Sequence, residues 1–196
     1  MDPLLPPASD AGRRPPAPGR LELLRTFMNT VDLESGEDDF SSPAALAEWL
    51  TTRGFLAPDT GLGETDRQSA IGFREAVREL LEANAGHGSA REAGARLDRI
   101  ATRVPLRVRV GISPGLEPED ASGIDAAIGR FLAIIYEAVT MGTWQHLKVC
   151  RNDTCRWAFC DSSRNHSGAW CTMAICGNRM KGRAFRRRHP AGAATG

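Results

Sequence analysis

Five cysteines are the residues of this chain best suited to chemistry. They stand at positions 150, 155, 160, 171 and 176, so that Cys150-x4-Cys155 and Cys171-x4-Cys176 form two outer pairs with fifteen residues between them. Zinc takes four thiolate or imidazole ligands in a tetrahedron, and two separated pairs of thiolates can supply them. Spacing alone also permits Cys155 and Cys160 as a pair, with His166 as a further candidate. The pattern predicts a metal site but leaves its members open.

Other interpretations of the cysteines remain. An iron–sulfur cluster uses the same residue type, and cysteine also serves as a small buried hydrophobe. The odd count of five argues against a disulfide framework. Residues 148–189 contain few large apolar side chains, and a segment of this size rarely folds without a disulfide or a bound metal. We therefore expect one Zn²⁺ per chain, whose binding is coupled to folding.

Charge is distributed unevenly along the 196 residues. Residues 148–189 hold ten of the 25 Lys and Arg but two of the 24 Asp and Glu, which gives this segment about +8 and leaves the remainder at about −7. The proline-rich first 19 residues do not resemble a secretory signal, and no apolar run is long enough to cross a membrane. We expect a cytoplasmic protein without membrane contact.

The last cysteine pair leads into a basic helix. Thr172 is a candidate cap for a helix from Met173 to about Arg188, with Met173, Cys176, Met180 and Ala184 on an inward stripe. Arginines on another face suit phosphates and guanine edges. The candidate nucleic-acid contacts are Arg164, Asn165, Asn178, Arg179, Lys181, Arg183, Arg186, Arg187 and Arg188.

The elements before the cysteines are mainly helical. Apolar periodicity predicts helices over 21–34, from Pro43 to Gly54, over 65–85, from Ser89 to Ile100, and from Ser122 to Gly142. Ser42 and Ser89 are the candidate N-caps of the second and the fourth of these helices. The alternating "PLRVRVGI" and the later Gly115 predict a β-hairpin. The fold class is thus α+β, mainly α, ending in a small four-cysteine, treble-clef-like finger with a basic helix. The predicted divisions are a disordered tail 1–19, a helical domain 20–147, the finger 148–189 and a flexible tail 190–196.

No residue set in the helical domain predicts catalysis. Asp32, Glu34 and residues 37–39 form an acidic cluster that could do acid–base work or bind a hard cation, but we interpret it as a solvated loop. Asn29 and Asp32, at the end of an apolar helix, could cap backbone groups or face a pocket, and we favour the structural role. There is no glycine-rich phosphate loop and no nucleophile elbow. Four cysteines would also complete the coordination of zinc and exclude a catalytic water. We expect that the chain is not an enzyme.

The segment from Val149 to His189 resembles the CGNR zinc finger. Cys176, Gly177, Asn178 and Arg179 supply the name-giving motif, and the Trp-Cys-Thr-Met run at 170–173 also fits. The resemblance implies that Cys150, Cys155, Cys171 and Cys176 bind zinc and that Cys160 is a spare thiol. This chain departs from the family at Gly168 and Ala169, where two arginines are common. If those arginines contact phosphate, the departure weakens nucleic-acid binding.

The upstream residues are similar to the ABATE domain that precedes this finger. The similarity lies in "LELLRTFMNTVDL", "PAALAEWL" and "GTWQHLKVC". Together the two resemblances imply a bacterial stress-induced transcription regulator. The hypothesis is a DNA-binding regulator whose helical domain senses a small-molecule signal or forms a homodimer. Rival hypotheses are an adaptor finger that binds protein only, a thiol sensor that releases zinc on oxidation, and an RNA-binding finger.

Overall fold

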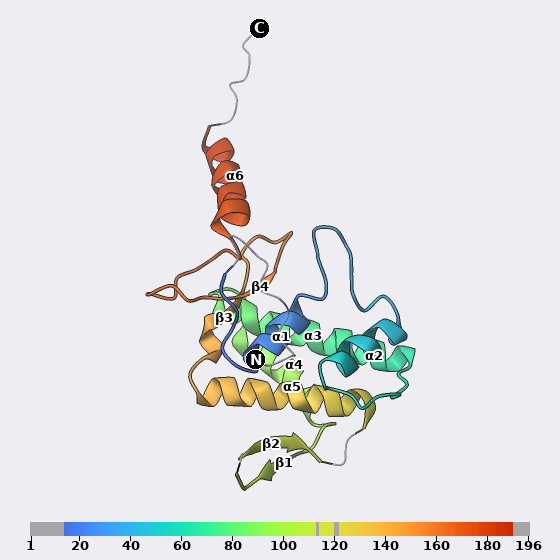
Figure 1. Ribbon diagram of the computed structural model, residues 1–196. Helices are drawn as coiled ribbons and strands as arrows, with labels where there is room; N and C mark the ends of the chain where they lie inside the picture. Colours follow the sequence, from blue (N-terminus) through green and yellow to red (C-terminus); the bar gives the residue numbers. More distant parts are fainter. Residues whose placement is uncertain (1–13, 113, 120–121, 190–196) are drawn as a thin grey trace.

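The computed structural model describes residues 14–112, 114–119 and 122–189 (Figure 1). Most of the predicted tails, residues 1–13 and 190–196, lie outside the described residues. Residues 14–19 were predicted to be disordered as well, but they pack against the protein. Ala17 is buried, and its N–H donates to the buried carboxylate of Glu22 at 2.7 Å. The described fold therefore begins at Arg14, ahead of the predicted boundary.

The described residues before the finger form five helices: α1 (Leu21–Met28), α2 (Pro43–Thr52), α3 (Glu64–Asn84), α4 (Ala90–Ala101) and α5 (Gly123–Thr140). The hydroxyls of Ser42 and Ser89 accept from Ala45 N and Glu92 N, so both predicted N-caps are confirmed. The first helix is shorter than predicted, because the chain after Met28 turns into a loop closed by the Val31–Asp38 bridge.

An aromatic cluster forms the centre of the helical core. Phe131 of α5 lies between Phe27 of α1 and Phe55, with ring centroids 4.4 and 4.1 Å apart. Phe73 of α3 completes the contact between α1 and α5. These side chains are buried, which is why the three helices keep a fixed arrangement. None of the helices in the described parts of the chain combines the length and apolar character that a membrane crossing requires.

The predicted hairpin is present. Strand β1 (Leu106–Arg109) pairs antiparallel with β2 (Gly115–Pro118), and β2 packs on α5. The contact depends on Gly129, because a Cβ there would lie 2.8 Å from Pro118 Cγ and from Val104 Cγ1. In Figure 1 this hairpin lies at the opposite end of the molecule from the last helix.

A second antiparallel hairpin joins the finger to the helical core. After the short turn η1 (Trp144–His146), β3 (Leu147–Val149) pairs with β4 (Ala158–Cys160). β3 packs on α3 and β4 on α1, and the inward side chains of both strands belong to the same hydrophobic core as the helices. A single core thus crosses the predicted division at residues 147 and 148. The division itself stays a prediction.

The chain ends in η2 (Met173–Gly177), a π-helical turn, and α6 (Asn178–Arg188). Thr172 caps this helical segment through Ile175 N at 3.2 Å, as predicted. The predicted inward stripe is wrong, because α6 buries none of its residues and Met173 is about half exposed. The stripe fails because α6 projects away from the body of the protein (Figure 1), which leaves its residues exposed or only half-buried.

Candidate metal centre

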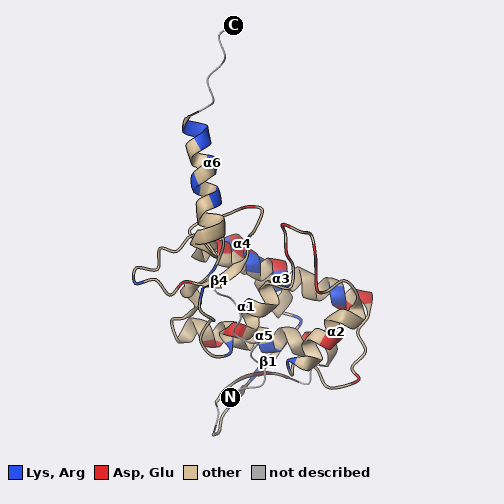
Figure 2. Cartoon of the chain, turned by 45° about the horizontal axis from the view of Figure 1, so that its top comes forward, with Lys and Arg blue, Asp and Glu red and all other residues tan. Residues whose placement is uncertain are grey.

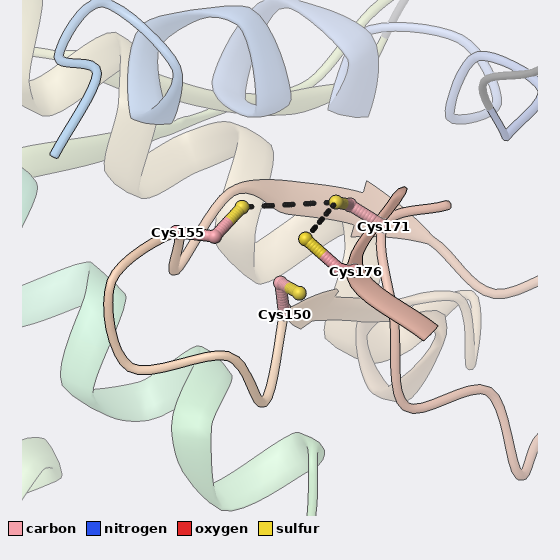
Figure 3. Close-up of side chains that lie close together, drawn as sticks. All are labelled: Cys150, Cys155, Cys171 and Cys176. Atoms are coloured by element: carbon pink, nitrogen blue, oxygen red, sulfur yellow. Dashed lines mark hydrogen bonds between the residues drawn. The ribbon is translucent and has the colours of Figure 1, made fainter. Parts of the chain in front are cut away.

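Four cysteine sulfurs converge on one point (Figure 3). The Sγ atoms of Cys150, Cys155, Cys171 and Cys176 all lie within 4.8 Å of one another. Cys171 Sγ lies 3.7 Å from Cys155 Sγ and 3.6 Å from Cys176 Sγ. A zinc tetrahedron with Zn–S bonds of about 2.3 Å has sulfur–sulfur edges of about 3.8 Å. The spacing of the sulfurs therefore fits zinc.

The first cysteine pair sits on the turn between β3 and β4. Cys150 N donates to Trp157 O at 2.9 Å and extends the ladder by one pair, while Cys155 N donates to Asn152 O at 2.8 Å. Arg156 takes a positive φ of 45°, which turns the chain back into β4. This tight turn brings the two sulfurs to one side of the hairpin.

The second pair comes from the start of the final helical segment. Cys171 precedes the capping residue Thr172, and Cys176 lies in the π-helical turn η2. One cysteine pair thus comes from the turn of a hairpin and the other from the start of a helix. This arrangement is the one expected of the predicted treble-clef-like finger. The wide π turn places Cys176 toward the centre while its neighbours, Met173 and Ile175, remain exposed.

Asn152 supports the site from outside the sulfur cluster, and sequence reasoning missed it. Its side chain is fully buried, and Nδ2 donates to Cys176 Sγ at 3.7 Å. Its Oδ1 accepts from Thr154 Oγ1 and from Arg183 Nη1, both at 3.3 Å. Partners that hydrogen-bond a metal ligand fix its orientation and tune the metal. The sequence offered one signal for this role, an asparagine between two cysteines. Asparagine is also common in ordinary turns, so the signal was ambiguous.

Thiols of this cluster lie close enough together to change one another's pKa values. Hydrogen bonds from Cys155 and then Cys171 lower the pKa of the Cys150 thiol, whereas the pKa values of Cys155 and Cys171 are raised, chiefly by hydrogen bonding with Cys150. Four thiolates this close repel one another, so protons or a metal dication must balance them. Thiolate donors at tetrahedral spacing fit Zn²⁺, and one zinc per chain is bound here.

Cys160 lies outside the cluster. It is the last residue of β4, is buried, and burial raises the pKa of its thiol. A neutral buried thiol is a poor nucleophile and a poor ligand. His166, the other spare candidate, contacts His146 Nδ1 through its own Nδ1 at 2.9 Å rather than the sulfurs.

A buried ion pair fastens the loop between the cysteine pairs. Asp161, with no exposed surface, accepts from Lys148 Nζ at 2.9 Å, from Gly168 N at 2.7 Å and from Ser163 Oγ at 2.7 Å. Burial raises the pKa of Asp161, but bonds from Ser163, Lys148 and Gly168 outweigh it and hold the pKa below its usual range. Arg14 adds an ion pair from the N-terminal side at 3.3 Å. The loop is thus tied at both ends.

Helices of the first domain hold the zinc turn in place. Buried Arg78 of α3 donates to Arg156 O at 2.8 Å and to Met28 O at 2.7 Å. Asn29 brackets the backbone of Ala158, accepting from its N–H at 2.7 Å and donating to its carbonyl at 2.9 Å. The zinc site is therefore built on α1 and α3 as well as on the finger.

The predicted nucleic-acid residues lie in two places, the loop between the cysteine pairs and α6. Arg164 and Asn165 are exposed in the loop between the cysteine pairs, apart from α6. The basic residues of α6 are exposed along that helix, except that Arg179 is half-buried. Asn178 donates to Ala174 O and Arg183 donates to Asn152 Oδ1, so both side chains take part in the local fold. Figure 2 shows the basic residues, in blue, spread along the ribbon of α6.

The helical core and the four-sulfur site define a zinc-finger protein in which a helical domain and the finger share one core. A family model for the CGNR zinc finger matches residues 146–189, and the ABATE model, described as "Putative stress-induced transcription regulator", matches residues 10–140. The second match alone covers more than half of the chain, so this protein belongs to the ABATE family and carries a CGNR zinc finger. No curated protein matches the chain.

Proposed function

We propose that this protein is a zinc-dependent, DNA-binding transcriptional regulator that contacts DNA through α6. The main support for the proposal is that α6 is an exposed and strongly basic helix. α6 buries none of its 11 residues, is anchored beside the zinc ligand Cys176, and carries six Lys or Arg and no acid. A helix of this length extends about 16 Å and is narrow enough to enter a major groove about 12 Å wide.

The metal has a structural role in this proposal. Four thiolates complete the tetrahedron and leave no position for a water or a substrate, so we assign no catalytic chemistry to it. Zinc fixes the start of α6 relative to the body, and an isolated helix of this length would be marginal in water. The expected non-enzymatic character remains part of the proposal.

Salt-dependent binding tests the proposal. Fluorescence anisotropy with labelled duplex DNA between 50 and 200 mM salt should show affinity that falls steeply, because each neutralised phosphate releases counterions. Arg186→Ala and Arg187→Ala should each weaken binding several-fold and reduce the salt slope by about 1. Arg183 is unsuitable for this test, because its bond to Asn152 links it to the zinc site.

Arg91→Ala is the matched control, since Arg91 is an exposed arginine on α4, far along the chain from the finger. It should leave DNA affinity unchanged, and all variants should keep one zinc per chain. Equal affinity for wild type, Arg186→Ala and Arg187→Ala would refute the role of α6. Binding to RNA in preference to duplex DNA, or to protein alone, would favour the corresponding rival function.

We further propose that the helical domain mediates dimerisation through the β1–β2 hairpin and the adjoining face of α5. Large apolar side chains are exposed there: Val108, Val110, Tyr136, Val139 and Met141 are 54–87% exposed. Four of them, Val108, Val110, Tyr136 and Met141, line a groove of about 570 Å³ together with Arg20, Glu137 and their neighbours. Clustered exposed apolar side chains mark interaction surfaces. A small-molecule signal at this domain stays a prediction.

The oligomeric state tests the dimer. Sedimentation at micromolar concentrations should give a dimer for wild type and a monomer for Val110→Asp, whereas Leu33→Asp, at an exposed apolar residue elsewhere, should remain dimeric. A monomeric wild type would refute this part of the proposal. Because the hairpin and α6 lie at opposite ends of the molecule (Figure 1), such a dimer would carry its two fingers at its far ends.

A further inference from the structure

The acidic loop, residues 32–39, is braced at its base. Arg74, buried in α3, holds the Asp38 carboxylate through two bonds of 2.9 and 2.6 Å. Backbone bonds from Asp32 N to Glu37 O and from Asp39 N to Thr30 O, both 2.8 Å, close the loop. The base is fixed by these contacts, and the tip, residues 34–36, is exposed. The loop therefore holds its tip at a defined place.

The tip of the acidic loop reaches the basic helix. Glu34 Oε1 accepts from Arg179 Nη1 at 2.6 Å, although the two residues are 145 positions apart. Arg179 lies in the first turn of α6, three positions after the zinc ligand Cys176. Among the described residues, this is the ion pair that links α6 to the helical domain. Figure 1 shows the loop rising beside the finger.

A cleft lies between the acidic loop and the finger, and residues of both line it. Its volume is about 190 Å³, and Asp32 and Glu34 line it on one side. Trp157 and Ile175 of the finger also line it, together with three of the four zinc-site cysteines, Cys155, Cys171 and Cys176. The Glu34–Arg179 pair bridges two surfaces that otherwise stand apart, so the contact can open without unpacking a core.

We infer that Glu34 acts as an intramolecular competitor for nucleic-acid phosphate at Arg179. This inference rests on the proposed function. A guanidinium binds carboxylate and phosphate oxygens through the same donors, so one excludes the other. DNA that engages the first turn of α6 must displace Glu34 and must also approach the remaining carboxylates of the loop. The acidic loop thereby weakens the binding of DNA to α6. It also makes the affinity depend on how many phosphates the nucleic acid presents to the helix.

The size of the effect follows from the exposure of the pair. Arg179 and Glu34 are 37% and 51% exposed, and ion pairs of this kind are weak. Glu34→Gln keeps the shape of the side chain and removes its charge. We expect that substitution to raise DNA affinity about two- to fivefold. The gain should require Arg179, so that in an Arg179→Ala background the Glu34→Gln substitution adds little.

The loop supplies its own control. Glu37→Gln removes the same charge three positions away, and the Glu37 carboxylate forms no ion pair within the described part of the chain. Anisotropy titrations of the zinc-loaded full chain with a duplex of about 20 base pairs should show a larger gain for Glu34→Gln than for Glu37→Gln. Equal gains would overturn the competitor role and leave the proposed function intact. Absence of binding by every variant at low salt would overturn both.

Discussion

The close approach of Gly168 to Asp161 leads to a prediction about an engineered side chain. A Cβ added to Gly168 would lie 2.6 Å from Asp161 Oδ1 and 2.7 Å from Arg14 Nη2. The backbone of Gly168 lies outside the left-handed region, so alanine would meet no conformational penalty there. The Gly168→Ala substitution therefore isolates a steric effect. It also indicates why an arginine at this position could not simply add a DNA contact.

The magnitude follows from how firmly Asp161 is held. Ordinary van der Waals contact to a Cβ begins at 3.4 Å, so the carboxylate must move by about 0.8 Å. Asp161 is fully buried and bonded to Lys148, Ser163 and Gly168, and such a movement strains or breaks at least one of these bonds. Overpacking costs about 1–3 kcal/mol, and a lost bond to a charged group costs about 1.5–3 kcal/mol.

Replacing glycine by alanine also lowers the entropy of the unfolded chain, and this effect offsets about 0.4–1 kcal/mol of the destabilisation. We therefore expect Gly168→Ala to lower the free energy of unfolding by about 1–3 kcal/mol. Gly168→Arg should cost at least as much and should not raise DNA affinity.

Urea denaturation of the zinc-loaded protein measures this effect as a lower midpoint at unchanged slope. Gly182→Ala in α6 is the control, because the nearest atom to a Cβ there, Arg186 Nη1, lies 3.5 Å away. That variant should be neutral or slightly stabilising. A Gly168→Ala protein as stable as wild type would refute the reasoning, as would an increase in DNA affinity on Gly168→Arg.

Further predictions concern the metal and the braced acidic loop. Removing zinc with a chelator should lower the midpoint of thermal unfolding by more than about 10 °C, because each kcal/mol of lost stability shifts this midpoint by about 2–4 °C. The helical part and the finger should unfold in one transition, followed by far-UV and near-UV circular dichroism. Two separate transitions would contradict the shared core. Elemental analysis should find zinc lost in Cys176→Ser and retained in Cys160→Ser, and the reverse would reassign the ligands. Although burial raises the pKa of Asp38, the bond from Arg74 lowers it below 3.8, so this carboxylate stabilises the fold above that pH and loses its effect as pH falls. The destabilisation of Asp38→Asn, followed by urea denaturation, should therefore shrink below pH about 4, and a constant difference would count against the ion pair.

Local patterns predicted the elements well where the cause was local. Ser42, Ser89 and Thr172 cap helices because a hydroxyl can satisfy an N–H two or three residues ahead, and that relation is written in the sequence. The alternation of apolar and basic residues before Gly115 predicted the hairpin correctly, because this pattern too is local in the sequence. The inward stripe predicted for α6 failed, because periodicity identifies a face but not whether a partner lies against it.

The supporting residues of the site could not be predicted in this way. Arg78 sits on the apolar stripe of α3, and a charge at such a position was a signal that could have been used. Its partners, Met28 O and Arg156 O, depend on how α1 and the zinc turn pack on α3. Asn29 was recognised as structural, but nothing near it in sequence pointed to Ala158.

The sequence by itself determined which residue types bind the metal, where the basic segment lies and that the last helix is cationic, because these depend on composition and short spacing. Tertiary structure alone decided that the finger shares a core with the helices, that Gly168 has no room for a side chain, and that Glu34 meets Arg179. The Glu34–Arg179 contact alone joins residues 145 positions apart. Such contacts are set by the shapes of packed side chains, and no local pattern encodes them.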